Sequence, residues 1–186
     1  MTRLIAVTGY SGAGKTTALE IIQRKRASSS ILYVGQLVSD EVLKRGLPPG
    51  PASEKAVRLQ LRHEHGMAAL ANLASPQVMS DLATDNIVLV DAVCNIEEFE
   101  HYRTYCDQKA LLIAIEANFD VRAGRVANRS SKKLSREELL ERDEVERCSL
   151  RTDIAITSAG LHIANEGSLD ALDALLSMEL RSFLNH

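Results

Sequence analysis

Residues Gly9–Thr16 place glycines, a lysine and a threonine at a spacing that suits phosphate chemistry. The segment reads G-Y-S-G-A-G-K-T and matches G-x-x-x-x-G-K-[ST] at every fixed position. Glycines let the backbone curl with its amides inward around phosphate oxygens, and the N-terminus of a following helix favours anions. We expect Lys15 to reach the terminal phosphates and the Thr16 hydroxyl to ligate magnesium. The sequence therefore predicts an ATP and Mg²⁺ site formed by Gly9, Ser11, Gly12, Ala13, Gly14, Lys15, Thr16 and Thr17. No N-K-x-D-type guanine motif is visible, and the choice between ATP and GTP stays open.

A second chemical signal is an acid at the end of an apolar run. Asp91 directly follows Ile87–Val90. Such an acid is the usual partner of a phosphate-binding loop, where it holds magnesium or a water on the metal. Contact with a phosphate acceptor, or capping of the next helix, are the alternatives. We assign Asp91 to catalysis and, with Thr16, to the metal.

Three arginines follow the next apolar run at spacings of three and four. On a helix, Arg122, Arg125 and Arg129 share one face and would clamp a transferring phosphoryl group. A solvated basic face is the alternative. The charge-dense stretch 129–151 is mostly typical of a solvated helix, and its start, 130–134, is also compatible with a mobile lid.

Alternating apolar and helical patterns must position these residues. The apolar runs 4–7, 31–34, 87–90, 111–115 and 162–164 predict buried strands. Between them, helical patterns cover about 37–45, 53–73, a second piece beyond Pro76 to Leu82, 96–105 and 121–126. Ser135 and Glu138 form a capping-box pattern, and Ser168 is expected to cap the last helix. The alternation predicts one α/β domain with a parallel sheet covered on both faces.

Composition excludes several other classes. The net charge is −3 and aromatic residues make up 4% of the 186 residues, which disfavours nucleic-acid binding, including a DNA or RNA end kinase. No apolar run approaches the roughly 20 residues that a membrane span needs. The apolar strand begins too early to leave room for a removable signal peptide, and a cytoplasmic location is expected. The sequence does not indicate an oligomeric state.

Several segments together resemble a known family. These are the loop Gly9–Thr16, D-E-V-L-K-R-G-L at 40–47, R-H-E-H-G-M at 62–67, Asp91, R-D-E-V-E-R at 142–147 and N-E-G-S-L at 165–169. Nearly the whole chain resembles the dephospho-CoA kinase-like and adenylate-kinase-related P-loop proteins of the nucleoside-monophosphate-kinase group. Within that group, the likeness is greatest to a small subfamily common in archaea.

The resemblance implies a fold and a site. It implies a five-stranded parallel sheet in a three-layer α/β/α arrangement, with a helical substrate-binding insert at about 37–82 and a short lid at about 129–134. It places Asn165, Glu166 and Gly167 beside the nucleotide base and matches Arg125 and Arg129 to the lid arginines. It implies ATP-dependent transfer to a small nucleotide-like acceptor: a nucleoside, a nucleoside monophosphate or a dephospho-CoA type molecule.

The sequence also departs from that family on the acceptor side. Relatives usually carry an Asp and an Arg where this chain has Gln36 and Ser39, and often an Arg where it has Cys94. The triphosphate side is intact. An altered acceptor, or a nucleotide-binding regulator or slow NTPase without a small-molecule acceptor, follows as a hypothesis.

Overall fold

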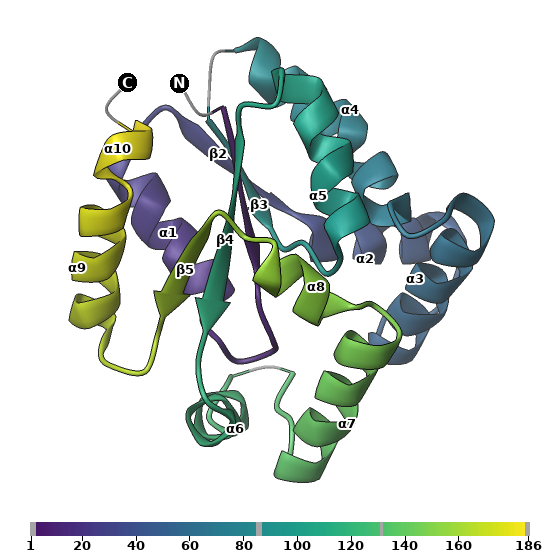
Figure 1. Cartoon of the computed structure of the whole chain (residues 1–186). Coiled ribbons are helices and arrows are strands. Elements are labelled where there is room, and N and C mark those ends of the chain that lie inside the picture. The colour runs from purple at the N-terminus through teal and green to yellow at the C-terminus, as the bar shows by residue number, and fades with distance from the viewer. Residues whose placement is uncertain (1–2, 85–86, 131, 185–186) are drawn as a thin grey trace.

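Five parallel strands form the centre of the computed structural model, which describes residues 3–84, 87–130 and 132–184. In chain order the strands are β1 (Leu4–Thr8), β2 (Ser29–Tyr33), β3 (Ile87–Asp91), β4 (Ala110–Glu116) and β5 (Leu161–Ala164). They lie in the order β2-β3-β1-β4-β5, and every neighbouring pair is parallel (Figure 1). The predicted five-stranded parallel sheet is confirmed.

The central strand, β1, shows why the segments that predict strands are apolar along their whole length. All five residues of β1 are buried, because helices cover both faces of the sheet. Leu4 and Ala6 belong to one hydrophobic core, and Ile5 belongs with Val7 to the other. Successive side chains of a strand point to opposite faces, so each strand contributes to both cores.

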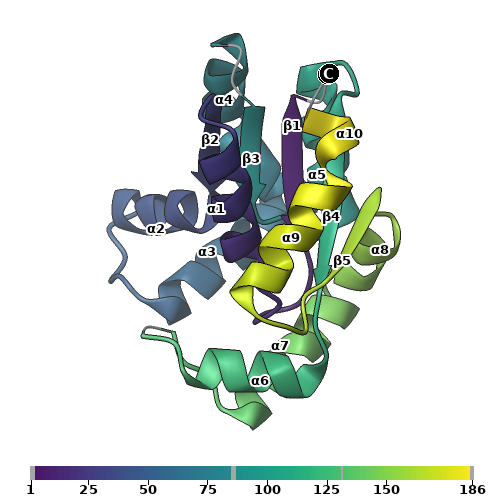
Figure 2. The ribbon, with the colours of Figure 1, turned by 90° about the vertical axis from the view of Figure 1, so that its left-hand side faces the viewer.

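The helices form a layer on each side of this sheet. On one side lie α1 (Lys15–Lys25) and α9 (Leu169–Glu179), which contact each other and are followed by α10 (Arg181–Leu184) (Figure 2). On the other side lie α2 (Val34–Lys44), α3 (Pro51–His65), α4 (Ala69–Ala83), α5 (Ile96–Arg103), the 3₁₀ turn η1 (Thr104–Cys106) and α8 (Thr152–Thr157). Helices α6 (Phe119–Ala127) and α7 (Arg136–Cys148) lie beyond the carboxyl ends of the strands (Figure 1).

The predicted helix 53–73 is wrong as a single element. Helix α3 ends at His65, its C-cap Gly66 has a φ of 78° that suits glycine, and α4 starts anew at Ala69. Pro76 lies inside α4 instead of interrupting the helix. Ala71, Ala74 and Val78 are buried against the sheet, and this packing explains why the helix continues through Pro76. Tertiary packing here outweighs the local helix-breaking preference of proline.

Smaller differences concern the element ends. The strand expected at 31–34 is β2 at 29–33, and α2 begins at Val34 without an intervening loop, so Gly35 lies within the helix. Helix α8 and the 3₁₀ turn η1 were not predicted as separate elements. Among the described residues, no helix has both the length and the apolar character needed to cross a membrane.

Candidate functional site

The loop between β1 and α1 follows the carboxyl end of the central strand. Gly9, Gly12 and Gly14 have φ values of 133°, 88° and 98°, which L side chains rarely adopt. A Cβ on Gly9 would lie 2.2 Å from the carbonyl oxygen of Ile115 in β4. Gly14 is the N-cap of α1, so the loop leads directly into a helix N-terminus. Ser11 and Ala13 are buried in this loop.

We expect Gly9→Ala to lower the free energy of unfolding by about 2–3 kcal/mol, since it combines an unfavourable φ with a backbone clash. For a domain of this size, that corresponds to a fall in Tm of roughly 5–10 °C. Thermal denaturation would measure it. Gly35→Ala is the control: Gly35 is exposed in α2, and an added Cβ meets nothing within 4 Å. Equal Tm values for the two variants would contradict the role given to Gly9.

The chemical side chains of the loop have defined partners. Lys15 Nζ donates to the carbonyl oxygens of Gly9 at 2.5 Å and Tyr10 at 3.0 Å. Burial lowers the pKa of Lys15, and nearby carboxylates partly oppose that shift. The Thr16 hydroxyl donates to Asp91 Oδ2 at 2.6 Å across 75 residues of sequence. The fold thus brings Lys15, Thr16 and Asp91 to one edge of the sheet.

The chemistry of Thr16 and Asp91 fits a magnesium ion. A hydroxyl and a carboxylate are hard oxygen ligands, and Mg²⁺ is usually held by one or two carboxylates together with substrate phosphates. The described residues contain no cluster of three or more His, Cys, Asp or Glu side chains that would hold a metal alone. Thr16 and Asp91 would therefore hold the ion together with bound phosphates.

The turn after β5 packs against the loop. The buried Asn165 donates from Nδ2 to the carbonyl oxygen of Ala13 at 2.8 Å. Arg125 donates to Ala13 O, Asn165 Oδ1 and Gly167 O, each at 3.4 Å. Glu166 accepts from the backbone and side-chain amides of Asn118, both at 2.7 Å. The structure thus brings Asn165, Gly167 and Arg125 together beside Ala13, whereas the carboxylate of Glu166 ties the turn to the start of α6.

The three predicted arginines do not share one helix face. Arg122 and Arg125 lie in α6, but Arg129 follows its end, because the helix stops at Ala127. Arg129 is exposed, and partial desolvation and the positive charge of Arg142 lower its pKa. Arg122 is buried: it pairs with Asp143 at 2.9 and 2.6 Å and donates to the carbonyl oxygen of Ser11 at 3.1 Å. Arg122 therefore connects the loop at Ser11 to Asp143 of α7.

The predicted lid and insert touch each other. Lys132 Nζ lies 3.3 Å from a carboxylate oxygen of Glu54 in the first turn of α3. Ser131, which belongs to the predicted lid, lies outside the described residues. The division into core, insert and lid stays a prediction.

The acceptor-side departures have ordinary protein partners. Gln36 donates to Asp40 at 2.9 Å, and the Ser39 hydroxyl donates to Glu54 at 3.0 Å. Burial and the charge of Glu98 raise the pKa of the Cys94 thiol to about 11, so the thiol is neutral near pH 7. None of Gln36, Ser39 and Cys94 supplies a cation.

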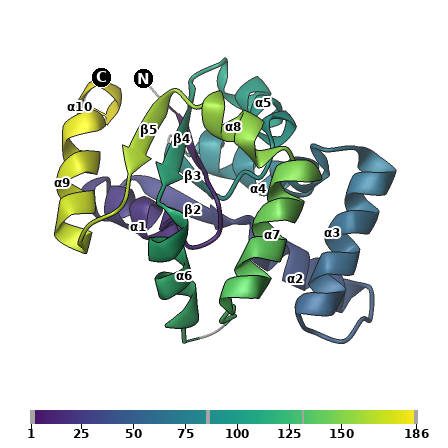
Figure 3. The same cartoon turned by 60° about the horizontal axis from the view of Figure 1, so that its bottom comes forward.

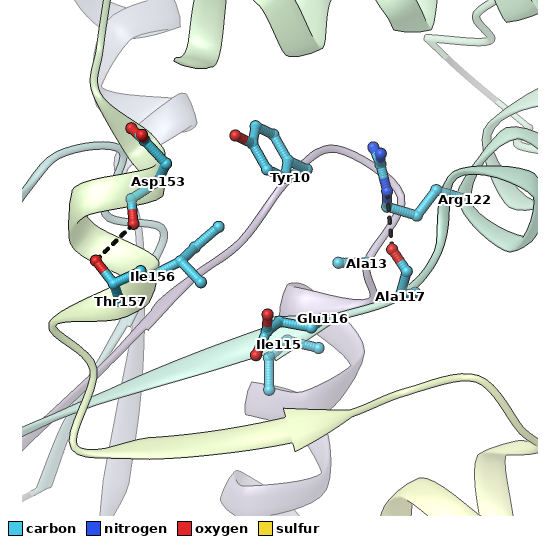
Figure 4. Close-up of a pocket in the computed structure, with 9 residues that line it drawn as sticks. All are labelled: Tyr10, Ala13, Ile115, Glu116, Ala117, Arg122, Asp153, Ile156 and Thr157. Carbon is cyan, nitrogen blue, oxygen red and sulfur yellow. Dashed lines mark hydrogen bonds between the residues drawn. The ribbon is translucent and has the colours of Figure 1, made fainter.

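A recess lies beside the loop. It has a volume of about 190 Å³, and its walls include Tyr10 and Arg122 on one side and Asp153, Ile156 and Thr157 of α8 on the other (Figure 4). Lys15, Thr16 and Asp91 do not line it. The guanidinium of Arg122 packs over the ring of Tyr10, with its Cζ 5.4 Å from the ring centre. The two side chains form the wall of the recess on the side of the loop.

Sequence reasoning missed the inward face of α7. The stretch 129–151 was interpreted as mostly solvated, yet Leu139 and Glu146 are buried and Asp143 is held by Arg122. The spacing of three and four between Leu139, Asp143 and Glu146 was the available signal, because it places them on one helix face.

The chain is similar to one family model and to several archaeal proteins. A family model described as an AAA domain matches residues 5–148. A UPF0200 protein of Methanosarcina mazei is 33% identical over 172 residues, covering 91% of this chain and 89% of that protein. A UPF0200 protein of Methanosarcina acetivorans is 31% identical over 186 residues, covering 99% and 97%. A UPF0200/UPF0201 protein of Archaeoglobus fulgidus is 32% identical, and this chain spans about half, 52%, of its length.

Solved structures share the fold. The crystal structure of TT1252 from Thermus thermophilus superposes with a TM-score of 0.64 at 22% identity, covering 97% of each chain. Shikimate kinase from Bacteroides thetaiotaomicron superposes with a TM-score of 0.60 at 16% identity, covering 95% of this chain and 97% of that one. At such identities the likeness concerns the fold alone, which is that of P-loop kinases. The chain therefore belongs to the UPF0200 family, and its residues 5–148 form the AAA domain of a P-loop protein.

Proposed function

We propose that this protein is an ATP-dependent, magnesium-requiring phosphotransferase. It would move the γ-phosphoryl group of ATP to a small acceptor of the nucleoside, nucleoside monophosphate or dephospho-CoA type. The observation that carries the proposal is the hydrogen bond from Thr16 to Asp91, 2.6 Å long, at the head of a glycine loop that holds Lys15. The same fold occurs in shikimate kinases and in a sugar kinase, so it is compatible with such a reaction.

Each residue has a physical role in this scheme. The amides of residues 11–16 cradle the phosphates, and Lys15 neutralises charge that develops during transfer. Thr16 and Asp91 would hold magnesium, which would supply Lewis-acid stabilisation of the phosphate oxygens. Arg125 lies beside the turn Asn165–Gly167, where the base would bind. Arg129, exposed just after α6, would reach the phosphates from the predicted lid. Phosphoryl transfer needs mainly positioning and electrostatic stabilisation, and these groups supply both.

A product assay tests the proposal. The protein is incubated with ATP, Mg²⁺ and a panel of nucleosides, nucleoside monophosphates and dephospho-CoA, and the phosphorus-containing products are identified by ³¹P NMR. A phosphorylated acceptor formed in step with ADP is the expected result. Conversion of ATP to ADP and inorganic phosphate, with no phosphorylated acceptor, would contradict the kinase. It would support the second candidate, a slow NTPase or nucleotide-dependent regulator. That candidate is favoured by the acceptor side, where relatives carry an Asp at the position of Gln36 and an Arg at the positions of Ser39 and Cys94.

We expect Asp91→Asn to lower the rate of ATP turnover by about 10²-fold and to raise the Mg²⁺ concentration needed for half-maximal rate. The substitution removes a charged oxygen ligand and keeps the side-chain shape. Steady-state kinetics over a Mg²⁺ series would measure both effects. Glu100→Gln is the control, because Glu100 is exposed on α5 and pairs with Arg103 on the same helix. An unchanged Mg²⁺ dependence in Asp91→Asn would remove Asp91 from the metal site.

A further inference from the structure

Helix α7 presents one charged face to the phosphate-binding loop. Arg142, Asp143 and Glu146 lie at spacings of one, three and four residues, next to the buried Leu139 one turn earlier. Figure 3 shows α7 between α6 and α3, at the end of the sheet where the loop between β1 and α1 lies. The charges of α7 are therefore part of the surroundings of Lys15.

The position of α7 relative to the loop is fixed by one buried arginine. Arg122 forms two hydrogen bonds with Asp143 and donates to Ser11 O and Ala117 O, both at 3.1 Å. The guanidinium also packs over the rings of Tyr10 and Phe119. A side chain one turn after Asp143 is thus held in a defined place with respect to the loop.

That side chain is Glu146, a buried carboxylate with an unused oxygen. Glu146 is 8% exposed, and Arg142 donates to its Oε1 at 2.8 Å. Among the residues that the structure describes, no group donates to its Oε2. Burial lowers the pKa of Lys15, and Glu146 opposes this more strongly than any other carboxylate, including Asp91. The carboxylate thus lies near Lys15, on the helix that Arg122 ties to Ser11 of the loop.

A carboxylate is an unfavourable neighbour for a site that only binds anions. Like charges repel strongly where water is excluded, so Glu146 would weaken phosphate binding unless it has another task. Three cations of α3 and the segment after α6 are already paired: Arg58 and Lys132 contact Glu54, and Arg62 contacts Glu98. A carboxylate near the loop, together with cations that are already paired, suits an acceptor whose reacting group carries no charge.

We propose that Glu146 is the catalytic base and that the acceptor's reacting group is a hydroxyl. The inference rests on the proposed phosphotransferase function. The hydroxyl oxygen forms a bond to the γ-phosphorus while the bond from that phosphorus to the β,γ-bridging oxygen breaks, and the electron pair leaves with ADP. The hydroxyl proton passes to the free oxygen of Glu146 and then to water. Arg142 holds the other oxygen and keeps the carboxylate in place.

Glu146→Gln tests this role because it removes the base and keeps an oxygen for Arg142. We expect ATP turnover to fall by about 10²-fold or more, as general-base catalysis contributes 10²–10⁴-fold. The Kd for ATP should stay unchanged or decrease, since a negative charge near the phosphates is lost. Glu144→Gln is the matched control: Glu144 lies on the same helix and pairs with Arg147 as Glu146 pairs with Arg142, but it is exposed.

The outcomes separate this inference from the proposed function. A turnover of Glu146→Gln within threefold of wild type, or a fall matched by an equal loss of ATP affinity, would overturn the role of Glu146. A phosphate monoester phosphorylated on its phosphate group would overturn the hydroxyl acceptor and leave the kinase standing. If wild type only hydrolyses ATP, the kinase fails, yet water is then the attacking hydroxyl and the same rate ratio between Glu146→Gln and wild type is expected.

Discussion

Lys15→Ala is expected to weaken ATP binding by about 10²-fold and to slow turnover by about 10³-fold. The amino group of Lys15 donates to Gly9 O and Tyr10 O at the loop, where burial lowers its pKa. A charged donor in a desolvated site interacts with phosphate far more strongly than one in water. Isothermal titration with a non-hydrolysable ATP analogue would measure binding, and ADP release would measure turnover.

The control for Lys15→Ala is Lys25→Ala. Lys25 lies in the last turn of the same helix and pairs with Asp173 of α9, so its removal also deletes one positive charge from α1. We expect its Kd for ATP to stay within twofold of wild type. Triphosphate binding that survives in Lys15→Ala undiminished would count against the kinase and also against the regulator or NTPase, since both need the loop.

The loop and the strands were predictable because their signals are local. The glycines, Lys15 and Thr16 lie within eight adjacent residues, and each apolar run that predicts a strand is at most five residues long. Asp91 was predictable because parallel strands end at one edge of the sheet, which brings it to Thr16. The break at Gly66 was missed, since a glycine is compatible with both a helix and its end until the packing of α4 decides.

The inward face of α7 was not predictable, because its meaning depends on pairs between distant residues. Arg122 and Asp143 are 21 residues apart, and Arg122 and Ser11 are 111 apart. A helix rich in both charge signs is normally solvated, so Asp143 and Glu146 carried no distinct signal. For the same reason Arg122 was grouped with Arg125 and Arg129, whereas the structure buries it behind the loop.

Asp143→Ala should be the most destabilising substitution near the site. It leaves the guanidinium of Arg122 buried without its carboxylate partner, and breaking a buried ion pair costs about 3–5 kcal/mol. The side chains are 7% exposed for Arg122 and 18% for Asp143, so water replaces little of the lost interaction. We expect a fall in Tm of roughly 6–20 °C. Urea denaturation, with the slope m unchanged, would give the free energy directly.

The same substitution should also affect turnover through α7. Without Asp143, the helix is no longer fixed to Arg122 and the loop, so Arg142 and Glu146 lose their defined place. We expect Asp143→Ala, assayed below its Tm, to lose turnover more than ATP affinity, because Lys15 and the loop amides remain. Asp143→Asn, which keeps one hydrogen-bond acceptor, should fall between Ala and wild type in both measurements.

Asp120→Ala gives the matched control, since Asp120 and Arg136 also join α6 to α7 but are 78% and 56% exposed. An exposed pair contributes at most about 1 kcal/mol, so this variant should remain close to wild type. The double variant Arg122→Met, Asp143→Ala should recover part of the stability lost in Asp143→Ala, because it removes the unpaired buried charge. If Asp143→Ala and Asp120→Ala lose equal stability, the ion pair of Arg122 and Asp143 does not anchor α7. The role proposed for Glu146 then loses its structural basis.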